Sequence, residues 1–310
     1  MTKLVIQIPC YNEEGTIAKT IKDIPKKIAG ISKIEILVID DGSCDNTSKE
    51  AKKSGAKIKR LNSNRGLAKA FAYGVDEALS IGADIIVNID GDNQYQGKDI
   101  EKLIKPIIKG EADIVIGDRC VESLEEYSWI KRKLHKIGSY FIKKLSGIDV
   151  PDPVSGFRAI SKNAAAKINI MSSFSYTTEM IIQAGHKDII LISVPIKTNK
   201  TRRPSRLFGS IPEFVAYSAI TILRTYIMYK PLRSFLFIGA FFMIVGAIPI
   251  IRFLYFYFLG SGDGHIQSLV IGGMLLIVGF ISFLTALLAD VLAGIRRMQE
   301  RIIERFESKK

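Results

Sequence analysis

The stretch IIVNIDGDNQ, which runs from Ile85 to Gln94, decides the expected fold of this chain. It begins as a short apolar run and turns at Asp90 into an acidic segment that contains glycine. A short apolar run that ends in turn residues is typical of a buried strand, so we predict a strand over Ile85–Ile89. In open α/β sheets, ligands bind outside the carboxyl ends of the strands. Asp90 and Asp92 are therefore expected to lie at a functional site.

Outward from this strand, short apolar runs alternate with longer helical patterns. The other predicted strands are Leu4–Ile8, Ile36–Ile39, Ile114–Ile116 and Ile189–Val194. The predicted helices are Thr16–Ile28, Asp45–Ser54, Leu67–Ser80 and Lys98–Lys109. This alternation predicts an α/β fold, with a Rossmann-like, mostly parallel sheet that has helices on both faces.

Polar residues follow three further predicted strands at the point where each strand ends. They are Tyr11-Asn12-Glu13, Asp40-Asp41 and Asp118-Arg119. Because the carboxyl ends of parallel strands meet at one edge of a sheet, we expect these side chains to share one crevice with Asp90 and Asp92.

The last third of the chain contains two long apolar runs. Phe235–Leu259 carries one charge, Arg252, and Ile266–Ala289 carries none, so each meets the roughly 20 residues needed to cross a bilayer. Lys and Arg residues flank the pair on both outer sides and are absent from Gly260–His265, which by the positive-inside rule places both termini in the cytoplasm. No cleavable signal peptide is expected at the N-terminus.

These patterns give a domain plan for a multi-pass membrane protein with two spans. We predict a cytoplasmic catalytic domain at 1–210, an amphipathic juxtamembrane helix at 211–232, a two-helix transmembrane hairpin at 233–290 and a basic cytoplasmic tail at 291–310. Within the first domain, residues 129–145 interleave lysines and arginines with aromatic and aliphatic residues. This pattern predicts a basic interfacial helix on an anionic membrane surface; an ordinary helix with a solvated basic face is the alternative.

The net charge of +13 is compatible with nucleic acid, anionic lipid or a phosphorylated substrate as partner. Together with two spans, it favours lipid phosphate and no nucleic acid. The three cysteines have no paired spacing for zinc or disulfides, so all three are interpreted as small packing residues.

Two common nucleotide-binding motifs are absent. The first strand leads into Pro9-Cys10-Tyr11-Asn12-Glu13 instead of a glycine-rich fingerprint, and no P-loop motif occurs, which argues against nicotinamide enzymes and P-loop ATPases. In contrast, Asp90, Asp92 and the amide of Gln94 offer hard oxygen ligands for one divalent ion, Mg²⁺ or Mn²⁺. Such an ion would bridge a nucleotide pyrophosphate and neutralise charge on a departing nucleoside diphosphate.

Seven short motifs occur together between residues 3 and 210. They are Ile8–Glu14, Val38–Ser43, Asn64-Arg65-Gly66, Asp90–Gln94, Gly117-Asp118-Arg119, Asp152–Arg158 and Arg202–Arg206. In this order they resemble the family-2 glycosyltransferases with the GT-A fold, and among them the dolichyl- or polyprenyl-phosphate sugar synthases. The resemblance implies a hexosyltransferase that moves a sugar from a UDP- or GDP-sugar to a dolichyl or undecaprenyl phosphate at the cytoplasmic membrane face.

The resemblance also implies roles for particular residues. The base and ribose of the donor would be held by Pro9, Tyr11, Glu13 and Asp41. The metal and diphosphate would be held by Asp90, Asp92 and Gln94, and Arg202, Ser205 and Arg206 would close over the donor phosphates from a mobile loop. The acceptor phosphate would meet Arg119, Arg132 and Ser155, and the catalytic role would fall to Asp90, Asp92, Arg119 and Arg132.

Three positions depart from the usual family pattern. Pro204 stands where family members usually have Gly, which leaves the conformation of that loop open, and Gly91 and Asn93 stand where Ala and Leu are frequent, which leaves the donor open.

The chemistry follows from the acceptor. A phosphate monoester is largely a dianion at neutral pH, so it can attack the anomeric carbon without an enzymic base. We predict one in-line displacement with inversion, driven by positioning and charge stabilisation. Asp152 is predicted to orient sugar hydroxyls or a basic residue, or else to serve only a turn, and Glu179 is a further candidate for a sugar contact.

Other functions stay open at this point. A processive polysaccharide synthase would need a Gln-x-x-Arg-Trp motif, which the single tryptophan, Trp129, cannot supply. A glycosyltransferase with another lipid or glycan acceptor in cell-surface polysaccharide synthesis is one alternative. A non-catalytic subunit that binds a lipid carrier is the other, although it would not need the acids at 90 and 92. Two spans are few for a stable membrane bundle, so self-association is compatible with the sequence.

Overall fold

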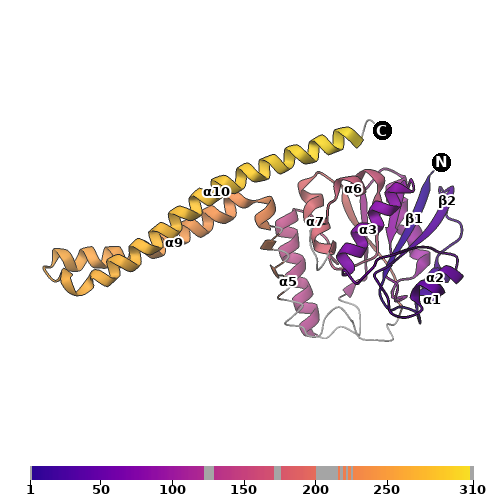
Figure 1. The fold of residues 1–310 in the computed structure, drawn as a ribbon, viewed down its shortest axis with the longest axis horizontal. Coiled ribbons are helices and arrows are strands. Elements are labelled where there is room, and N and C mark those ends of the chain that lie inside the picture. The colour runs from indigo at the N-terminus through magenta and orange to yellow at the C-terminus, as the bar shows by residue number, and fades with distance from the viewer. Residues whose placement is uncertain are drawn as a thin grey trace. The chain divides into compact units, whose positions relative to one another are not determined.

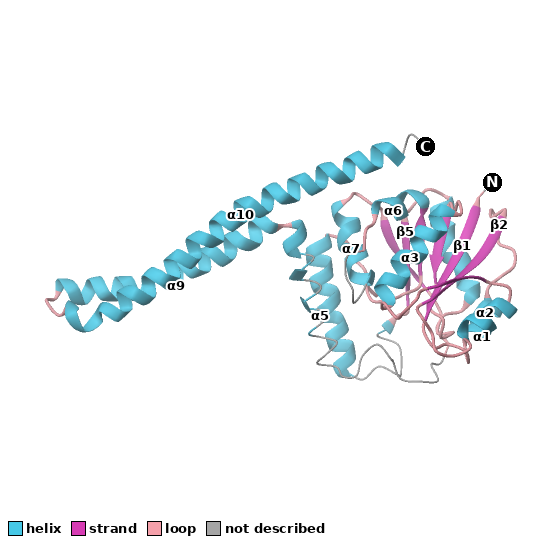
Figure 2. Cartoon of the chain, viewed as in Figure 1, coloured by secondary structure: helices cyan, strands magenta, loops and turns pink. Residues whose placement is uncertain are grey.

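The computed structural model describes residues 2–121, 129–170, 176–199, 216, 219–220, 223–224 and 226–307. The chain forms two compact units, Met1–Ile222 and Leu223–Lys310. The first unit is an α/β domain and the second is built from helices (Figures 1 and 2).

The α/β unit is built on one seven-stranded sheet with the strand order β3-β2-β1-β4-β6-β5-β7. The strands are β1 (Lys3–Cys10), β2 (Lys33–Asp40), β3 (Lys57–Arg60), β4 (Ile85–Asn88), β5 (Ile114–Asp118), β6 (Arg158–Ser161) and β7 (Leu191–Pro195). All neighbouring strands pair in parallel except β6, which is antiparallel to both β4 and β5. The prediction of a mostly parallel sheet is confirmed.

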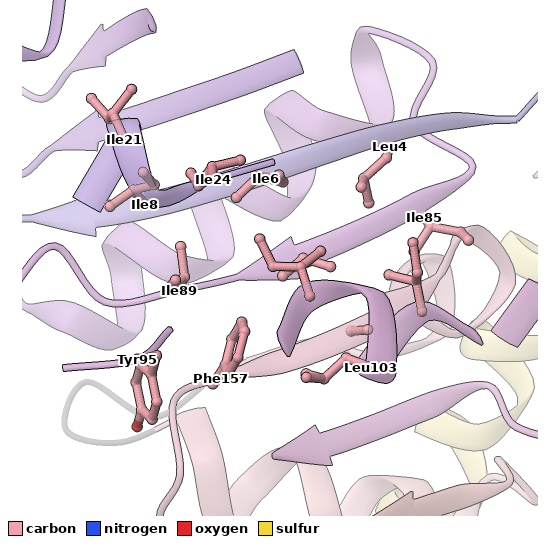
Figure 3. Packing of buried hydrophobic residues seen from close by; sticks show 14 of the residues in the cluster. Leu4, Ile6, Ile8, Ile21, Ile24, Ile85, Ile89, Tyr95, Leu103 and Phe157 are labelled. Carbon is pink, nitrogen blue, oxygen red and sulfur yellow. The ribbon is translucent and has the colours of Figure 1, made fainter. Parts of the chain in front are cut away.

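Two hydrophobic cores cover the two faces of this sheet. Side chains alternate between faces along a strand, so Leu4 and Ile6 of β1 enter one core and Val5 enters the other. Helices α1 (Ile17–Asp23), α2 (Thr47–Lys53) and α4 (Ile100–Ile108) contribute to the first core, part of which is drawn in Figure 3. Helices α3 (Leu67–Ser80), α5 (Trp129–Ser146), α6 (Lys162–Lys167) and α7 (Tyr176–His186) contribute to the second.

The structure corrects several sequence-based boundaries. Helix α1 ends at Asp23 instead of Ile28, because a residue that precedes proline, here Ile24 before Pro25, is disfavoured in helical conformation. Strand β3 was not predicted because it is a short, charged edge strand, and β6 because only two of its four residues, Ala159 and Ile160, are apolar. A one-turn 3₁₀ helix, η1 (Gly97–Asp99), precedes α4. Of the cysteines only Cys10 is buried, whereas Cys44 and Cys120 are exposed, so the packing interpretation was wrong for those two.

The second unit is a hairpin of α9 (Pro231–Phe258) and α10 (Ile266–Glu307), joined through the 3₁₀ helix η3 (Gly262–His265). Two segments, Pro231–Phe258 and Gly262–Arg296, are long and apolar enough to cross a membrane, and only 11% of the most apolar window of each is buried. Helix α10 continues to Glu307, so the predicted basic tail is helical over most of its length. Of the predicted juxtamembrane helix at 211–232, residues 216, 219–220, 223–224 and 226–229 are helical, and 211–215, 217–218, 221–222 and 225 lie outside the described residues.

Glycines lie where the two helices of the hairpin touch. A Cβ atom placed on Gly246 would lie 3.1 Å from the carbonyl oxygen of Gly272, and one placed on Gly272 would lie 2.8 Å from that of Gly246. Gly239 and Gly279 form a second reciprocal contact, at 3.0 Å in each direction. Small residues let helix backbones approach closely in this way, which supports association where no hydrophobic driving force acts between helices.

Candidate active site

The acidic motif, Asp90–Gln94, follows β4 and forms a turn held by hydrogen bonds. Asp92 Oδ1 accepts a hydrogen bond from the backbone N–H of Gln94 at 3.0 Å, and Asn93 has a left-handed backbone with φ of 60°. Asparagine tolerates this conformation better than most residues. The hydroxyl of Thr20 donates to the carbonyl oxygen of Gly91 at 3.1 Å. The motif is therefore anchored to α1 and is not a free acidic loop.

Asp90 lies directly against a second motif, the turn from Asp152 to Arg158. A Cβ atom on Gly156 would lie 2.7 and 2.8 Å from the two carboxylate oxygens of Asp90, so only glycine fits there. Gly156 is itself held by its N–H, which donates to the hydroxyl of Tyr95 at 3.1 Å, and by its carbonyl, which accepts from Asn88 Nδ2 at 2.7 Å. Two motifs about 60 residues apart are thus joined in one site.

The electrostatics of the site are set by this crowding. Burial, and after it the negative charge of Asp92, raises the pKa of Asp90 to about 7, although the positive charges of Arg119 and Arg158 act in the opposite direction. Two carboxylates that disfavour each other's charge are stabilised by a cation between them. No group of three or more His, Cys, Asp or Glu side chains that could hold a metal is found in the described part of the chain. A metal held here would therefore use Asp90 and Asp92 with other oxygens, among which the amide of Gln94, two residues after Asp92, is the predicted one.

The loops after β1 and β2 are joined into one wall. The N–H of Asn12 donates to Ser43 Oγ at 2.9 Å, Asn12 Oδ1 accepts from the N–H of Cys44 at 2.8 Å, and the N–H of Glu13 donates to Thr47 Oγ1 at 2.7 Å. An open cavity of about 470 Å³ lies between the loops and is lined by Asn12, Glu13, Glu14, Gly15, Thr16, Cys44 and Asp45. Its volume falls in the range of small-molecule sites.

The residues predicted to hold the base and ribose lie around this wall. Pro9 is buried near the end of β1, Tyr11 is exposed, and the carboxylate of Glu13 accepts from the Thr16 hydroxyl at 2.7 Å. Asp41 is buried, and its two oxygens accept from the N–H groups of Arg65 and Gly66, each at 2.8 Å. Asp41 therefore shapes the 64–66 loop, which is a role that its position after β2 did not predict.

A buried ion pair lies next to the acidic motif. The guanidinium of Arg119 donates from Nε to Asp152 Oδ2 at 2.6 Å and from Nη2 to Asp152 Oδ1 at 3.0 Å. His135 Nε2 of α5 lies 3.2 Å from Asp152 Oδ1. Burial alone would raise the pKa of Asp152, but the hydrogen bonds from His135 and Arg119 outweigh it and hold that pKa well below its usual range. Of the roles considered for Asp152, the structure shows the orientation of basic residues.

Arg158 organises the backbone of the site, a role that the sequence did not predict. Its side chain is fully buried and donates to three backbone carbonyls, those of Ser155, Thr177 and Pro153, at 2.7–2.8 Å. Burial lowers its pKa to about 10. These bonds fold the turn around Ser155, whose own hydroxyl is buried and has no hydrogen-bond partner among the described residues. A buried hydroxyl without a partner is unfavourable by about 1–3 kcal/mol, so this position suits a polar ligand or water.

The remaining predicted residues divide into three groups. Arg202, Ser205 and Arg206 lie outside the described residues. Arg132 lies on α5, partly buried, one helical turn before His135. Glu179 is buried in α7, where it accepts a hydrogen bond from Gln183 Nε2 at 3.3 Å.

The comparisons with known proteins agree with the fold. A family model described as glycosyl transferase family 2 matches residues 5–168. The chain is 32% identical over 213 residues to the UDP-N-acetylglucosamine–dolichyl-phosphate N-acetylglucosaminyltransferase of Methanococcus voltae, a match that covers 62% of this chain and 83% of that protein. It is 30% identical over 217 residues to the dolichol-phosphate mannosyltransferase of Pyrococcus furiosus, covering 67% of this chain and 60% of that one.

A solved structure shares the same architecture. Glucosyl-3-phosphoglycerate synthase from Mycobacterium tuberculosis aligns with a TM-score of 0.54 at 20% identity, over 73% of this chain and 79% of that one. The predicted GT-A fold is confirmed.

Proposed function

The chain belongs to glycosyltransferase family 2, and we propose that it transfers a hexose from a UDP- or GDP-sugar to a polyprenyl phosphate, with inversion, at the cytoplasmic face of a membrane. The observation that carries the proposal is the pair Asp90 and Asp92, fixed after β4 and packed against Gly156.

The acidic pair suits the donor diphosphate. Asp90, Asp92 and Gln94 would hold a divalent ion, Mg²⁺ or Mn²⁺, which when bound supplies positive charge to the leaving nucleoside diphosphate. The raised pKa of Asp90 supports this assignment, because a cation would relieve the repulsion between the two carboxylates. The similar synthase from Mycobacterium tuberculosis was crystallised with Mn²⁺ and UDP.

The basic residues suit the acceptor. Arg119 lies close enough to the acidic motif for its charge to act on Asp90, and an arginine fork matches phosphate oxygens in bidentate geometry. Asp152 holds that guanidinium in place before a ligand arrives. Because a phosphate monoester is already ionised, the chain needs only to align it with the anomeric carbon, and no residue has to remove a proton from it.

The acceptor class is supported by relatives and by exposed surface. Two relatives are named for transfer to dolichyl or dolichol phosphate. Helix α5 exposes Trp129, at 73% of its surface, together with Tyr140 and Phe141, among several lysines. Such a face suits a membrane interface. The hairpin of α9 and α10 would anchor the enzyme where a lipid acceptor is found.

The donor side is completed by the segment that follows β7. The N–H of Asn199 donates to the carbonyl oxygen of Gln94 at 2.8 Å, and Asn199 Nδ2 donates to that of Asn93 at 3.0 Å. Arg202 follows only three residues later, a reach of at most about 11 Å from Asn199. We propose that Arg202, Ser205 and Arg206 bind the donor phosphates.

The proposal is tested with the purified full chain in detergent or lipid. It is incubated with a panel of UDP- and GDP-hexoses, undecaprenyl or dolichyl phosphate, and Mg²⁺ or Mn²⁺. The masses of the lipids are then measured by mass spectrometry. We expect one donor to yield a lipid whose mass increases by one sugar residue. Release of free sugar from every donor, with no lipid product from any, would contradict the proposal.

A further inference from the structure

Helix α5 is fastened to the segment after it by side chains from one of its faces. His135, Ser139 and Lys143 are spaced four residues apart and so lie on one face of the helix. They contact, in that order, Asp152 Oδ1 at 3.2 Å, the carbonyl oxygen of Pro151 at 3.3 Å, and the carboxylate of Asp149. The segment therefore runs back along the helix, and three successive turns of α5 each have an attachment to it.

Other side chains of α5 remain exposed. Trp129, Ile137, Tyr140 and Phe141 are between 45% and 73% exposed. Helix α5 thus has an attached face and an apolar exposed surface. A force that positions the exposed surface, such as contact with lipid, would be transmitted to the domain through the attached face.

Of the three attachments, only that of His135 ends at the candidate active site. Its partner Asp152 is fully buried and also holds Arg119 by two hydrogen bonds. An ionised carboxylate only accepts hydrogen bonds, so the His135 ring must donate from Nε2. Asp149, the partner of Lys143, is 71% exposed, and the Pro151 carbonyl has no side-chain charge to offer.

We propose that His135 is a positioning residue for the acceptor phosphate: through Asp152 it holds the Arg119 guanidinium in register with α5, which carries Arg132 one turn earlier. This inference rests on the proposed function. His135 does not touch the acceptor. It fixes the distance between the two arginines that the acceptor phosphate would bridge, Arg119 directly after β5 and Arg132 on α5.

Two substitutions of His135 distinguish loss of the hydrogen bond to Asp152 from loss of the imidazole ring. A glutamine places its amide nitrogen close to the position of histidine Nε2, whereas the amide nitrogen of asparagine corresponds to Nδ1 and falls short. We therefore expect His135→Gln to keep the hydrogen bond to Asp152 and His135→Asn to lose it. The two variants are both neutral, polar and close in size.

The experiment measures sugar transfer to polyprenyl phosphate with each substrate varied in turn. For His135→Asn we expect KM for the lipid acceptor to rise about tenfold, the effect of losing one hydrogen bond to a charged group. We expect KM for the nucleotide-sugar to stay within about twofold, and His135→Gln to match the wild type on both. Ser139→Ala is the control, since it loosens the same helix face at an attachment that ends at no charged residue.

The outcomes separate this inference from the proposed function. If the wild type makes no lipid-linked sugar, the proposed function fails, whatever residue 135 is. If the wild type is active but His135→Asn and His135→Gln share one acceptor KM, the positioning role is wrong. A rise in acceptor KM for Ser139→Ala as large as that for His135→Asn would also overturn it, because general loosening of α5 would then explain both.

Discussion

Glycine allows a close approach in both units of the chain, but the groups that it brings together differ. In the hairpin, Gly246 and Gly272 bring two helix backbones together, and their neighbours are apolar side chains and carbonyl oxygens. In the α/β unit, Gly156 brings a turn against the carboxylate of Asp90. The hairpin contact depends on shape alone, so it can relax over a whole helix. The contact at Gly156 fixes a charged group, so a small displacement there changes the chemistry.

The treatment of polar groups separates the units further. Buried polar side chains in proteins are normally hydrogen-bonded, and the α/β unit follows this rule with Asp40, Asp41, Asp152 and Arg158, all of which are buried and bonded. The hairpin instead exposes a long series of large apolar side chains, as expected of a surface that faces lipid. The comparison teaches that charge placement decides function in one unit and apolar area decides location in the other.

The strongest expected effect comes from the acidic motif. Asp92→Asn should lower the rate of sugar transfer about a thousandfold or more, because it removes a charged ligand of the divalent ion that would stabilise the leaving group. The hairpin should be unaffected, so the variant should still insert into membranes. Transfer is followed by mass analysis of lipid product, with Asp263→Asn in the hairpin loop as the matched control. A chelator that leaves the wild-type rate unchanged would argue against the role assigned to Asp92.

The next effect concerns Gly156. The added methyl of Gly156→Ala would lie within 2.8 Å of both Asp90 oxygens and should displace that carboxylate, lowering kcat about a hundredfold. Gly138→Ala on α5 is the control, since a Cβ there meets nothing within 4 Å. Equal activity of the two variants would show that the position of Asp90 does not matter.

The corresponding test in the hairpin compares neighbouring glycines. A Cβ on Gly272 would lie 2.4 Å from Ile250 Cγ1, whereas one on Gly273 meets nothing within 4 Å. Gly272→Ala should therefore destabilise the hairpin by about 1–3 kcal/mol, the usual effect of overpacking, and Gly273→Ala should not. Unfolding in mixed micelles, followed by circular dichroism, measures the difference. We expect kcat to change far less in Gly272→Ala than in Gly156→Ala.

The smallest effect is a pH dependence of the α/β unit. The pKa of Asp152 is lowered in the folded state, so its contribution to stability is present above the usual aspartate pKa and is lost as pH falls from there toward the lowered value. Below about pH 4, this group should reduce the free energy of unfolding by up to about 1.4 kcal/mol per pH unit. Urea unfolding of the full chain in detergent at several pH values measures the slope, and Asp152→Asn should flatten it. An unchanged slope in that variant would refute the assignment.

The sequence predicted the features that are local. Five of the strands and helices α1 to α5 follow from local residue patterns, both apolar helices follow from the length of their apolar runs, and the polar residues at strand ends mark the site. It could not predict β6, whose antiparallel pairing with β4 and β5 depends on chain segments more than 40 residues away. His135 and Arg158 were missed as site residues for the same reason, because their partners are set by the tertiary fold and not by a spacing visible in the sequence.

The central claim is that an already ionised lipid phosphate displaces a nucleotide held at Asp90 and Asp92. It is tested most directly by offering the wild-type protein polyprenyl phosphate and the corresponding polyprenol in parallel, with the preferred donor, with Mg²⁺ or Mn²⁺ and with chelator. We predict a glycosylated lipid only from the phosphate and only with metal. Equal transfer to the alcohol, or transfer that persists with chelator, would contradict the account.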